Sequence, residues 1–131
     1  MSLARFLLVK VLIVDDDRAV RGLLKEIVKR DGSTPVVTSS GVEGYAALVA
    51  DPDNIGLILL DLSMPEMDGF RFREMQLEDP TLAAIPVVVL TGYGLTTREL
   101  DFMRPAAVLV KPASVFQIRE AIRAHAHPLA R

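Results

Sequence analysis

The stretch IGLILLDLSMPEMDG, residues 55–69, carries the strongest structural signal in the sequence. Its beginning, Ile55–Leu60, is nearly all apolar, and Asp61 follows directly. A continuous apolar run of this length is typical of a parallel β-strand that is buried on both faces of a sheet. The stretch therefore predicts a central strand with a carboxylate at its end.

Similar apolar runs occur on both sides of this strand. The N-terminal run is interrupted only by Lys10, whereas the next one contains Pro35 and is the weakest. Because proline cannot donate a hydrogen bond to a neighbouring strand, we expect the weak run to lie at an edge of the sheet. In chain order the additional strands are expected at Leu7–Val14, Thr34–Thr38, Pro86–Leu90 and Val108–Val110.

Amphipathic segments with helix-capping signals lie between these runs. Asp17 is the expected N-cap of the first helix and Gly32 its stop signal, and Asp68-Gly69 favours a turn into a helix over Gly69–Asp79. The apolar residues of the first helix recur at helical spacing: Val20, Leu23, Leu24, Ile27 and Val28. Capping-box spacings precede the apolar residues of the other helices: Ser40 with Glu43 before Val42, Tyr45, Ala46 and Val49; Thr96 with Glu99 before Leu100 and Met103; Ser114 with Gln117 before Ile118 and Ile122. Strands alternating with helices predict an α/β fold, a doubly wound (βα)₅ domain with a parallel five-stranded sheet covered on both faces.

The composition fits a single folded domain over residues 1–131. Half of the residues are hydrophobic, 24% are charged, and the formal net charge is −2. This balance gives no electrostatic reason to expect direct binding of nucleic acid or membrane. The absence of cysteine excludes disulfides and thiolate chemistry. The apolar run Phe6–Val14 is too short to span a bilayer and has no cleavage site, so we expect a cytoplasmic protein.

Polar residues follow the expected strands where a site would form. In an open α/β sheet, binding sites lie beyond the carboxyl ends of the strands. Those positions hold Asp15, Asp16 and Asp17 after the first strand, Asp61 after the third, Thr91 after the fourth and Lys111 after the fifth. We take Asp17 as a helix cap rather than a ligand, and we expect the arginines Arg21, Arg71 and Arg73 to lie on solvated helix faces.

The charges at this edge predict a metal-assisted phosphoryl site. If the first and third strands are neighbours, Asp15, Asp16 and Asp61 share one pocket, and each like-charge pair at ~4 Å costs about 4 kcal/mol at an effective dielectric of ~20. Mg²⁺ would relieve that repulsion and leave room for phosphate oxygens. Lys111 can then pair with a phosphoryl oxygen, Thr91 can donate a hydrogen bond to it, and Asp61 is the expected nucleophile.

These motifs together resemble the receiver domain of response regulators, the CheY-like phosphoacceptor switches of two-component signalling. The matching segments are Val14-Asp15-Asp16, LLDLSMPEMDG (59–69), VVVLTG (87–92) and Val110-Lys111-Pro112. The resemblance runs from about Val9 to His125. It implies a flavodoxin-like fold with strand order 2-1-3-4-5.

The resemblance also implies a role for each matching residue. Asp61 would accept a phosphoryl group in a Mg²⁺-dependent reaction, with Thr91 as the switch hydroxyl and Lys111 as the phosphoryl-binding lysine. The implied metal ligands are Asp15, Asp16, Asp61 and the backbone carbonyl of Ser63, with Asp16 the more direct of the acidic pair. In this family the Lys111–Pro112 peptide bond is often cis.

The implied partners are those of a signalling switch rather than of an enzyme with its own substrate. The phosphoryl donor would be a sensor histidine kinase or a phosphotransfer protein. The output would be a change of conformation that controls an effector protein or domain, with formation of a homodimer on phosphorylation left open. The domain would catalyse only its own phosphorylation and dephosphorylation.

One departure from the family pattern concerns the switch. Val108 stands three residues before Lys111, where the family usually has Tyr or Phe. A short β-branched side chain cannot rotate between buried and exposed positions as a ring does. We therefore expect phosphorylation to act through the Gly92-Tyr93-Gly94 loop and a short following helix.

Three other functions share parts of this pattern. An aspartyl-nucleophile phosphatase of the haloacid-dehalogenase type could use Asp15 and Asp17, but the chain shows no cap insertion. A flavodoxin-like FMN module would need a hydroxyl- and glycine-rich loop after the first strand, where three aspartates would repel phosphate. The third alternative is a receiver that no longer accepts phosphate and serves only in protein interactions.

Overall fold

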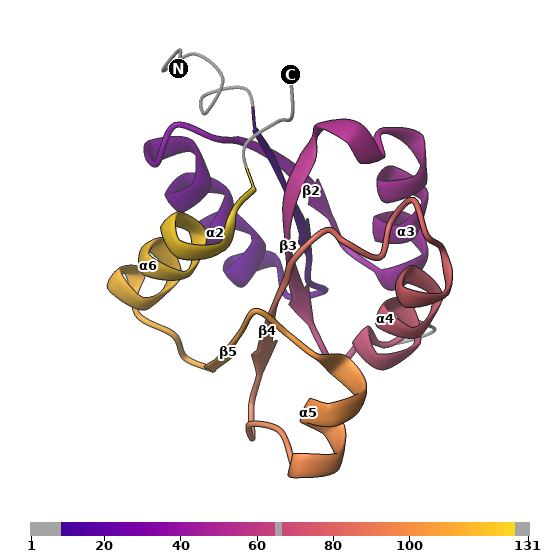
Figure 1. The fold of residues 1–131 in the computed structure, drawn as a ribbon. Coiled ribbons are helices and arrows are strands. Elements are labelled where there is room, and N and C mark those ends of the chain that lie inside the picture. Colours follow the sequence, from indigo (N-terminus) through magenta and orange to yellow (C-terminus); the bar gives the residue numbers. More distant parts are fainter. Residues whose placement is uncertain (1–8, 65–66, 128–131) are drawn as a thin grey trace.

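The computed structural model describes residues 9–64 and 67–127, and it confirms the predicted (βα)₅ fold. The strands are parallel and lie in the order β2-β1-β3-β4-β5, which leaves the proline-containing strand at an edge, as expected (Figure 1). They are β1 (Lys10–Val14), β2 (Thr34–Thr38), β3 (Ile55–Asp61), β4 (Val87–Thr91) and β5 (Ala107–Val110). Leu7 and Leu8, which the prediction included in the first strand, lie outside the described residues.

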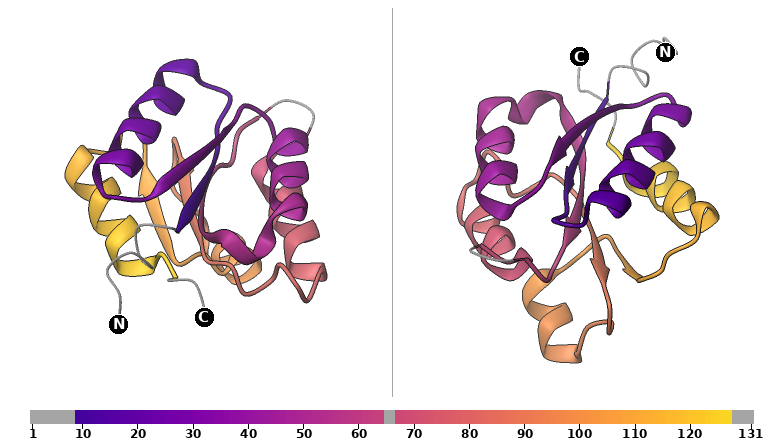
Figure 2. Two further views of the ribbon diagram at one scale, coloured as in Figure 1. Left: turned by 90° about the horizontal axis from the view of Figure 1, so that it is seen from above. Right: turned by 180° about the vertical axis from the view of Figure 1, so that it is seen from behind.

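Helices cover both faces of the sheet (Figures 1 and 2). On one face lie α2 (Arg18–Arg30) and α6 (Val115–His125). On the other lie α3 (Gly41–Ala50), α4 (Gly69–Glu78) and α5 (Thr97–Met103), with a 3₁₀ turn, η1 (Pro52–Asn54), before β3. Among the described residues, no helix combines the length and the apolar character needed to cross a bilayer.

The burial of strand β3 explains why its sequence is apolar from Ile55 to Leu60. All of its residues are buried. Because successive side chains of a strand point to opposite faces, Ile58 and Leu60 enter the core under α3 and α4, whereas Leu57 and Leu59 enter the core under α2 and α6. Because both faces of β3 pack in a hydrophobic core, the strand has no polar face, as its continuous apolar run predicted.

The helix caps largely follow the prediction. Asp17 Oδ1 accepts hydrogen bonds from the amides of Ala19 and Val20, and Thr96 with Glu99 and Ser114 with Gln117 form reciprocal capping boxes. The box predicted at Ser40 is displaced. Ser40 Oγ accepts from the Glu43 amide at 3.1 Å, but the Glu43 carboxylate accepts from the amide of Ser39 rather than from that of Ser40.

Helix α3 buries a different face from the one its apolar residues suggested. Gly44 and Leu48 are buried, whereas Val42 and Val49 are exposed. A Cβ atom on Gly44 would lie only 2.7 Å from Val14 Cγ2, so the helix packs on β1 more closely than a side chain would allow. A hydrophobic pattern alone does not reveal a contact face that includes a glycine.

Strand β5 is less buried than its sequence suggested. Within residues 9–64 and 67–127 it pairs with β4 alone, and none of its residues is fully buried; Val110 is 51% exposed. The prediction of a strand buried on both faces is therefore wrong for β5. The edge position explains this, because β5 is the last strand in the order of the described sheet.

Candidate functional site

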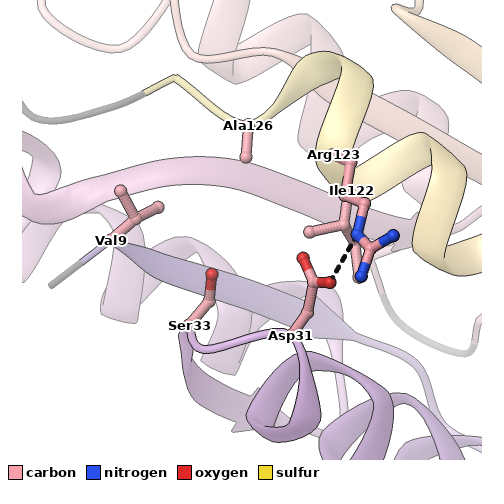
Figure 3. Close-up of a pocket in the computed structure, with 6 residues that line it drawn as sticks. All are labelled: Val9, Asp31, Ser33, Ile122, Arg123 and Ala126. Atoms are coloured by element: carbon pink, nitrogen blue, oxygen red, sulfur yellow. Dashed lines mark hydrogen bonds and ion pairs between the residues drawn. The ribbon is translucent and has the colours of Figure 1, made fainter. Parts of the chain in front are cut away.

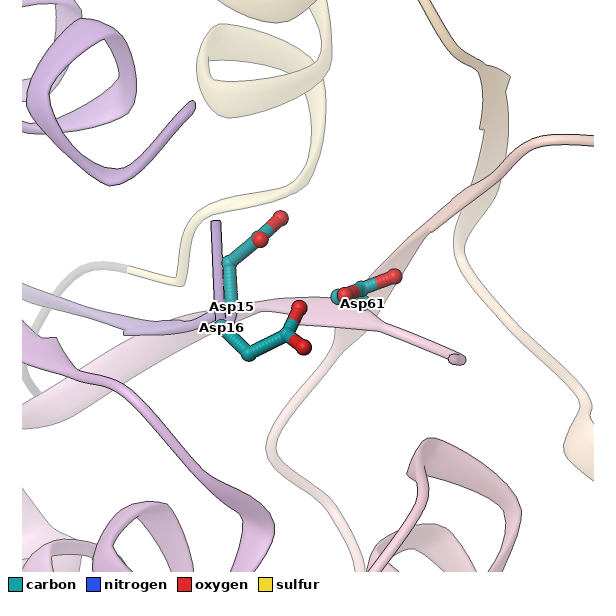
Figure 4. A group of neighbouring side chains, drawn as sticks. All are labelled: Asp15, Asp16 and Asp61. Carbon is teal, nitrogen blue, oxygen red and sulfur yellow. The ribbon is translucent and has the colours of Figure 1, made fainter. Parts of the chain in front are cut away.

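The carboxyl ends of β1 and β3 bring three carboxylates together, as predicted. The strands are neighbours and pair Val14 with Leu60, so Asp15 and Asp61, one residue further along, lie side by side. Asp16 follows Asp15, and each of the three aspartates offers an oxygen within 4.8 Å of the others. Figure 4 shows the three side chains at this edge of the sheet. The set has the hard oxygen donors that a divalent cation such as Mg²⁺ prefers.

Two of these carboxylates are shielded from solvent. Asp15 is 1% exposed and Asp61 is 3% exposed, whereas Asp16 is exposed. The pKa of Asp61 is raised from 3.8 to about 6, first by burial and then by the negative charge of Asp15, against the opposing effect of Lys111. The local field therefore disfavours three simultaneous negative charges.

Lys111 supplies positive charge to this cluster. Its Nζ lies 3.1 Å from Asp15 Oδ2 and 3.3 Å from Asp61 Oδ1. Burial alone would lower the pKa of Lys111, but the attraction of the two carboxylates outweighs burial and raises that pKa. The Lys111–Pro112 bond is cis, as the resemblance implied. One ammonium group balances only one of the three carboxylates, so the cluster remains short of positive charge.

Backbone contacts fix the orientation of the buried aspartates. The amide of Asp17 donates to Asp15 Oδ1 at 2.9 Å, and the amide of Ser63 donates to Asp61 Oδ1 at 3.2 Å. Arg21 Nη1 donates to the Asp15 carbonyl at 3.1 Å and is partly buried. We expected Arg21 on a solvated face, and the structure places it beside the site instead.

Thr91 reaches the site edge, but its hydroxyl is engaged elsewhere. Thr91 Oγ1 donates to the Gly94 carbonyl at 3.4 Å and accepts from the Tyr93 amide at 3.3 Å. Both contacts are long for hydrogen bonds of their type. Gly94 has φ 83°, a left-handed conformation suited to glycine, and Tyr93 is 99% exposed. The loop after β4 is thus tied to Thr91 by weak bonds.

An open pocket of about 410 Å³ lies over the carboxylates. Its lining combines acidic, basic and loop residues: Asp16, Asp17, Asp61, Ser63, Gly92, Tyr93 and Lys111. This arrangement can hold a cation against the carboxylates and present Asp61 to an incoming electrophile, with the Lys111 ammonium beside it.

A different pocket, of about 200 Å³, lies between the C-terminal ends of α2 and α6 (Figure 3). Asp31 at the end of α2 pairs there with Arg123 of α6, at 2.8 Å between Oδ1 and Nε. The rest of its lining is Val9, Ser33, Ile122 and Ala126. The charges of Asp31 and Arg123 already pair with each other. The six lining residues include neither a metal-ligand cluster nor a nucleophile with a base.

Arg73 contradicts the expectation of a solvated helix face. It belongs to α4, is 5% exposed, and its side chain reaches the Met103 carbonyl at the end of α5. Burial lowers the pKa of Arg73 to about 10, and Arg104 contributes to the lowering. By contrast, Arg71 is exposed and pairs with Glu74, as expected of a surface residue. No local sequence signal distinguishes the two arginines.

Comparison with known proteins gives consistent matches. The family model for the response regulator receiver domain matches residues 11–123. The sporulation initiation phosphotransferase F of Bacillus subtilis (strain 168) is 31% identical over 122 residues, which cover 87% of this chain and 90% of that protein. The transcriptional regulatory protein SrrA of Staphylococcus aureus (strain NCTC 8325 / PS 47) is 35% identical over 107 residues, which cover 80% of this chain and 42% of SrrA.

Solved structures agree with these matches. The N-terminal domain of a response regulator receiver protein from Methanoculleus marisnigri JR1 has a TM-score of 0.72 at 34% identity, covering 93% of this chain and 97% of that one. The chemotaxis protein CheY4 of Vibrio cholerae has a TM-score of 0.81 at 22% identity, covering 90% of this chain and 98% of that one. At that identity the likeness to CheY4 shows the fold alone. The chain spans most of the Bacillus relative but less than half of SrrA.

Proposed function

The chain belongs to the response regulator receiver domain family, and from that membership we propose that Asp61 is its phosphoacceptor. The observation that carries the proposal is the buried Asp61 carboxylate beside Asp15, with Lys111 Nζ at 3.3 Å. The proposal includes a single receiver domain over residues 1–131. The family membership decides against the phosphatase and FMN-binding alternatives.

The donor set fits Mg²⁺. Asp15, Asp16 and Asp61 offer oxygens within 4.8 Å of one another, and Lys111 leaves their charge incompletely balanced. We propose these carboxylates and the Ser63 carbonyl as protein ligands. When bound, Mg²⁺ would neutralise the carboxylates and attract phosphoryl oxygens.

In the proposed reaction, an oxygen of the ionised Asp61 carboxylate attacks the phosphorus of a phosphohistidine. The N–P bond breaks as the O–P bond forms, the electron pair of the N–P bond returns to the imidazole, and Asp61 becomes an acyl phosphate. Lys111 stays close enough to pair with a phosphoryl oxygen, because it already contacts Asp61. Thr91 would have to exchange its loop contacts for the phosphoryl group.

We propose that the domain works as a switch and not as an enzyme with an external substrate. Its phosphoryl donor would be a sensor histidine kinase or a phosphotransfer protein, and its target an effector protein or domain. The name of the Bacillus relative, a phosphotransferase that the chain covers almost completely, supports a phosphorelay role. A cytoplasmic location follows from these partners and belongs to the same proposal.

The decisive test is the mass of the intact protein after incubation with acetyl phosphate and Mg²⁺. The wild type should gain one phosphoryl group, and Asp61→Asn should gain none. Asp53→Asn is the matched control, since Asp53 is an exposed aspartate in η1. An unmodified wild type that also fails to bind beryllofluoride would favour the receiver that serves only in protein interactions. An undiminished adduct in Asp61→Asn would mean that another residue is the acceptor.

A further inference from the structure

Arg73 is a buried cation that the proposed phosphoryl chemistry does not use. No ion pair joins it to a carboxylate within the described ranges 9–64 and 67–127. Its donors bind neutral oxygens instead. Nε donates to the Met103 carbonyl at 2.8 Å, Nη2 to the Arg104 carbonyl at 3.1 Å, and Nη1 to Gln76 Oε1 at 2.7 Å. A planar guanidinium is the side chain suited to bind several acceptors at once.

These acceptors include the C-terminal end of α5. The last carbonyls of a helix have no partner within the helix and carry its partial negative charge, so a cation there is stabilising. Arg104, the C-cap, has φ 45°, which is uncommon for a residue other than glycine. Its amide donates to the Leu100 carbonyl at 2.8 Å while its own carbonyl accepts from Arg73. Arg73 thus holds both the helix end and its left-handed cap.

Helix α4 connects this contact to the phosphoacceptor. The amide of Gly69, its first residue, donates to the Leu62 carbonyl at 3.1 Å. A Cβ on Gly69 would lie 2.6 Å from the Asp61 carbonyl oxygen, so α4 begins directly against the backbone of the site. Arg73 lies about one turn further along α4.

Gln76 secures the same helix to the segment that enters β4. Its Nε2 donates to the carbonyls of Leu82 and Ile85, both at 2.9 Å, while its Oε1 accepts from Arg73. Gln76 is fully buried. The buried polar groups between α4 and α5 are therefore satisfied, which favours one fixed arrangement.

The N-terminal end of α5 is held differently. It follows the loop in which Thr91 makes long hydrogen bonds to Tyr93 and Gly94. A movement of Thr91 toward a phosphoryl group would break these bonds, whereas none of the Arg73 hydrogen bonds involves Thr91 or the loop that follows it. Helix α5 thus follows a loop that is joined to Thr91 by long hydrogen bonds, and its C-terminal end is bound to α4 through Arg73.

We propose that Arg73 is a positioning residue that anchors the C-terminal end of α5 to α4, so that phosphorylation displaces the N-terminal end of α5 about this fixed point. The displacement rests on the proposed phosphoacceptor function, but the anchor does not. The two parts are therefore tested separately, first without and then with a phosphoryl analogue.

The anchor is tested in the unphosphorylated protein by amide hydrogen exchange. In Arg73→Met, the Arg104 amide should exchange about 10- to 100-fold faster than in the wild type, since loss of a charge-assisted contact exposes the helix end. Amides of β1 and α2 should be unchanged. Arg71→Met, on the same helix but exposed, is the matched control and should leave the Arg104 rate at the wild-type value. Equal Arg104 rates in the two variants would overturn the anchor.

A second measurement covers the case in which Arg73→Met does not fold. Arg73→Lys keeps the positive charge and the alkyl chain but loses the planar guanidinium that binds several acceptors. The Arg104 amide should therefore exchange at a rate between those of the wild type and of Arg73→Met. In the wild type, the Nε–H of Arg73 should give a nitrogen-resolved NMR signal that exchanges slowly compared with that of Arg71. Rapid exchange at the Arg73 Nε–H would also overturn the anchor.

The fixed point is tested by adding beryllofluoride and Mg²⁺. Exchange rates of residues 92–98 should change in the wild type, while the Arg104 amide and the Arg73 Nε–H keep their rates. In Arg73→Met or Arg73→Lys the change should spread to Arg104. A wild-type change at Arg104 as large as that at residues 92–98 would overturn the fixed point. Absence of any beryllofluoride binding would instead refute the phosphoacceptor function and leave the anchor standing on the first experiment.

Discussion

Two regions of this domain bury charge, and they satisfy it to different degrees. At the carboxyl ends of β1 and β3, Asp15 and Asp61 are buried beside Asp16, with Lys111 as the contacting cation. Between α4 and α5, the cation Arg73 is buried among carbonyl and amide oxygens that engage its guanidinium. The first region has an excess of negative charge, and in the second each nitrogen of the guanidinium has a hydrogen-bond partner.

This difference distinguishes a ligand-binding site from a contact that stabilises the fold. A buried group whose partners are complete gains nothing from a ligand and resists rearrangement, whereas crowded carboxylates are stabilised by any cation that binds them. The pKa of Asp61, raised to about 6, reflects first the burial of this carboxyl and then its repulsion from Asp15. Removing charge should therefore have opposite effects on stability in the two regions.

The largest change in stability is expected from Arg73→Met. This variant leaves Gln76 and the end carbonyls of α5 without their donor, which should lower the free energy of unfolding by about 2–4 kcal/mol. Urea denaturation measures it. Arg71→Met, which removes only an exposed ion pair with Glu74, should change the free energy by less than about 0.5 kcal/mol. Similar losses in both variants would show that the buried contacts of Arg73 contribute little.

Asp61→Asn should raise the free energy of unfolding, whereas Arg73→Met lowers it. A carboxyl whose pKa rises from 3.8 to about 6 on folding is destabilised by ionisation, so at pH 7 without Mg²⁺ the asparagine variant should be more stable by about 1–3 kcal/mol. Between pH 4 and 6 Asp61 binds more protons in the folded protein than in the unfolded chain. Its contribution to stability should therefore fall as pH rises through this range, and the variant should lack that contribution. Denaturation at pH 4.5 and pH 7 distinguishes the two, and a variant less stable than the wild type at pH 7 would contradict the crowding.

A smaller gain is expected from Mg²⁺ itself. At ten times its dissociation constant, a ligand of the folded state adds about 1.4 kcal/mol, which raises the melting temperature of a domain of this size by about 4 °C. Thermal melts with and without millimolar Mg²⁺ provide the measurement. Asp16→Asn should remove most of the rise, and Asp53→Asn should retain it. The rise should also shrink below the pKa of Asp61, where protons compete with the cation. A pH-independent rise that survives in Asp16→Asn would place the ion elsewhere.

The sequence predicted the carboxylate cluster of the first region, though not Arg21 beside it, and it did not predict the second region. The β3 run predicted a strand buried on both faces, and the rule that sites form at the carboxyl ends of strands brought Asp15, Asp16 and Asp61 together. Arg73 was assigned to solvent because burial of an arginine depends on carbonyls 30 and 31 residues away. The glycine face of α3 was missed for a related reason, since close packing of backbone leaves no hydrophobic pattern. Contacts set by tertiary structure rather than by local spacing account for these errors.

The smallest stability effect is expected at Thr91, the last residue of β4. Its hydroxyl contacts are long, 3.3 and 3.4 Å, so Thr91→Val should cost less than about 1 kcal/mol in urea denaturation. Thr97→Val, in the exposed first turn of α5, is the matched control and should be similarly mild. The variants should differ once beryllofluoride binds, because valine cannot exchange a loop contact for a phosphoryl contact. Thr97→Val should keep the exchange-rate changes at residues 92–98, and Thr91→Val should lose them although the Asp61 pocket still takes up the analogue. If both variants respond like the wild type, the signal does not pass through the Thr91 hydroxyl, and the backbone contact between Asp61 and Gly69 becomes the remaining connection to α4 and its anchor.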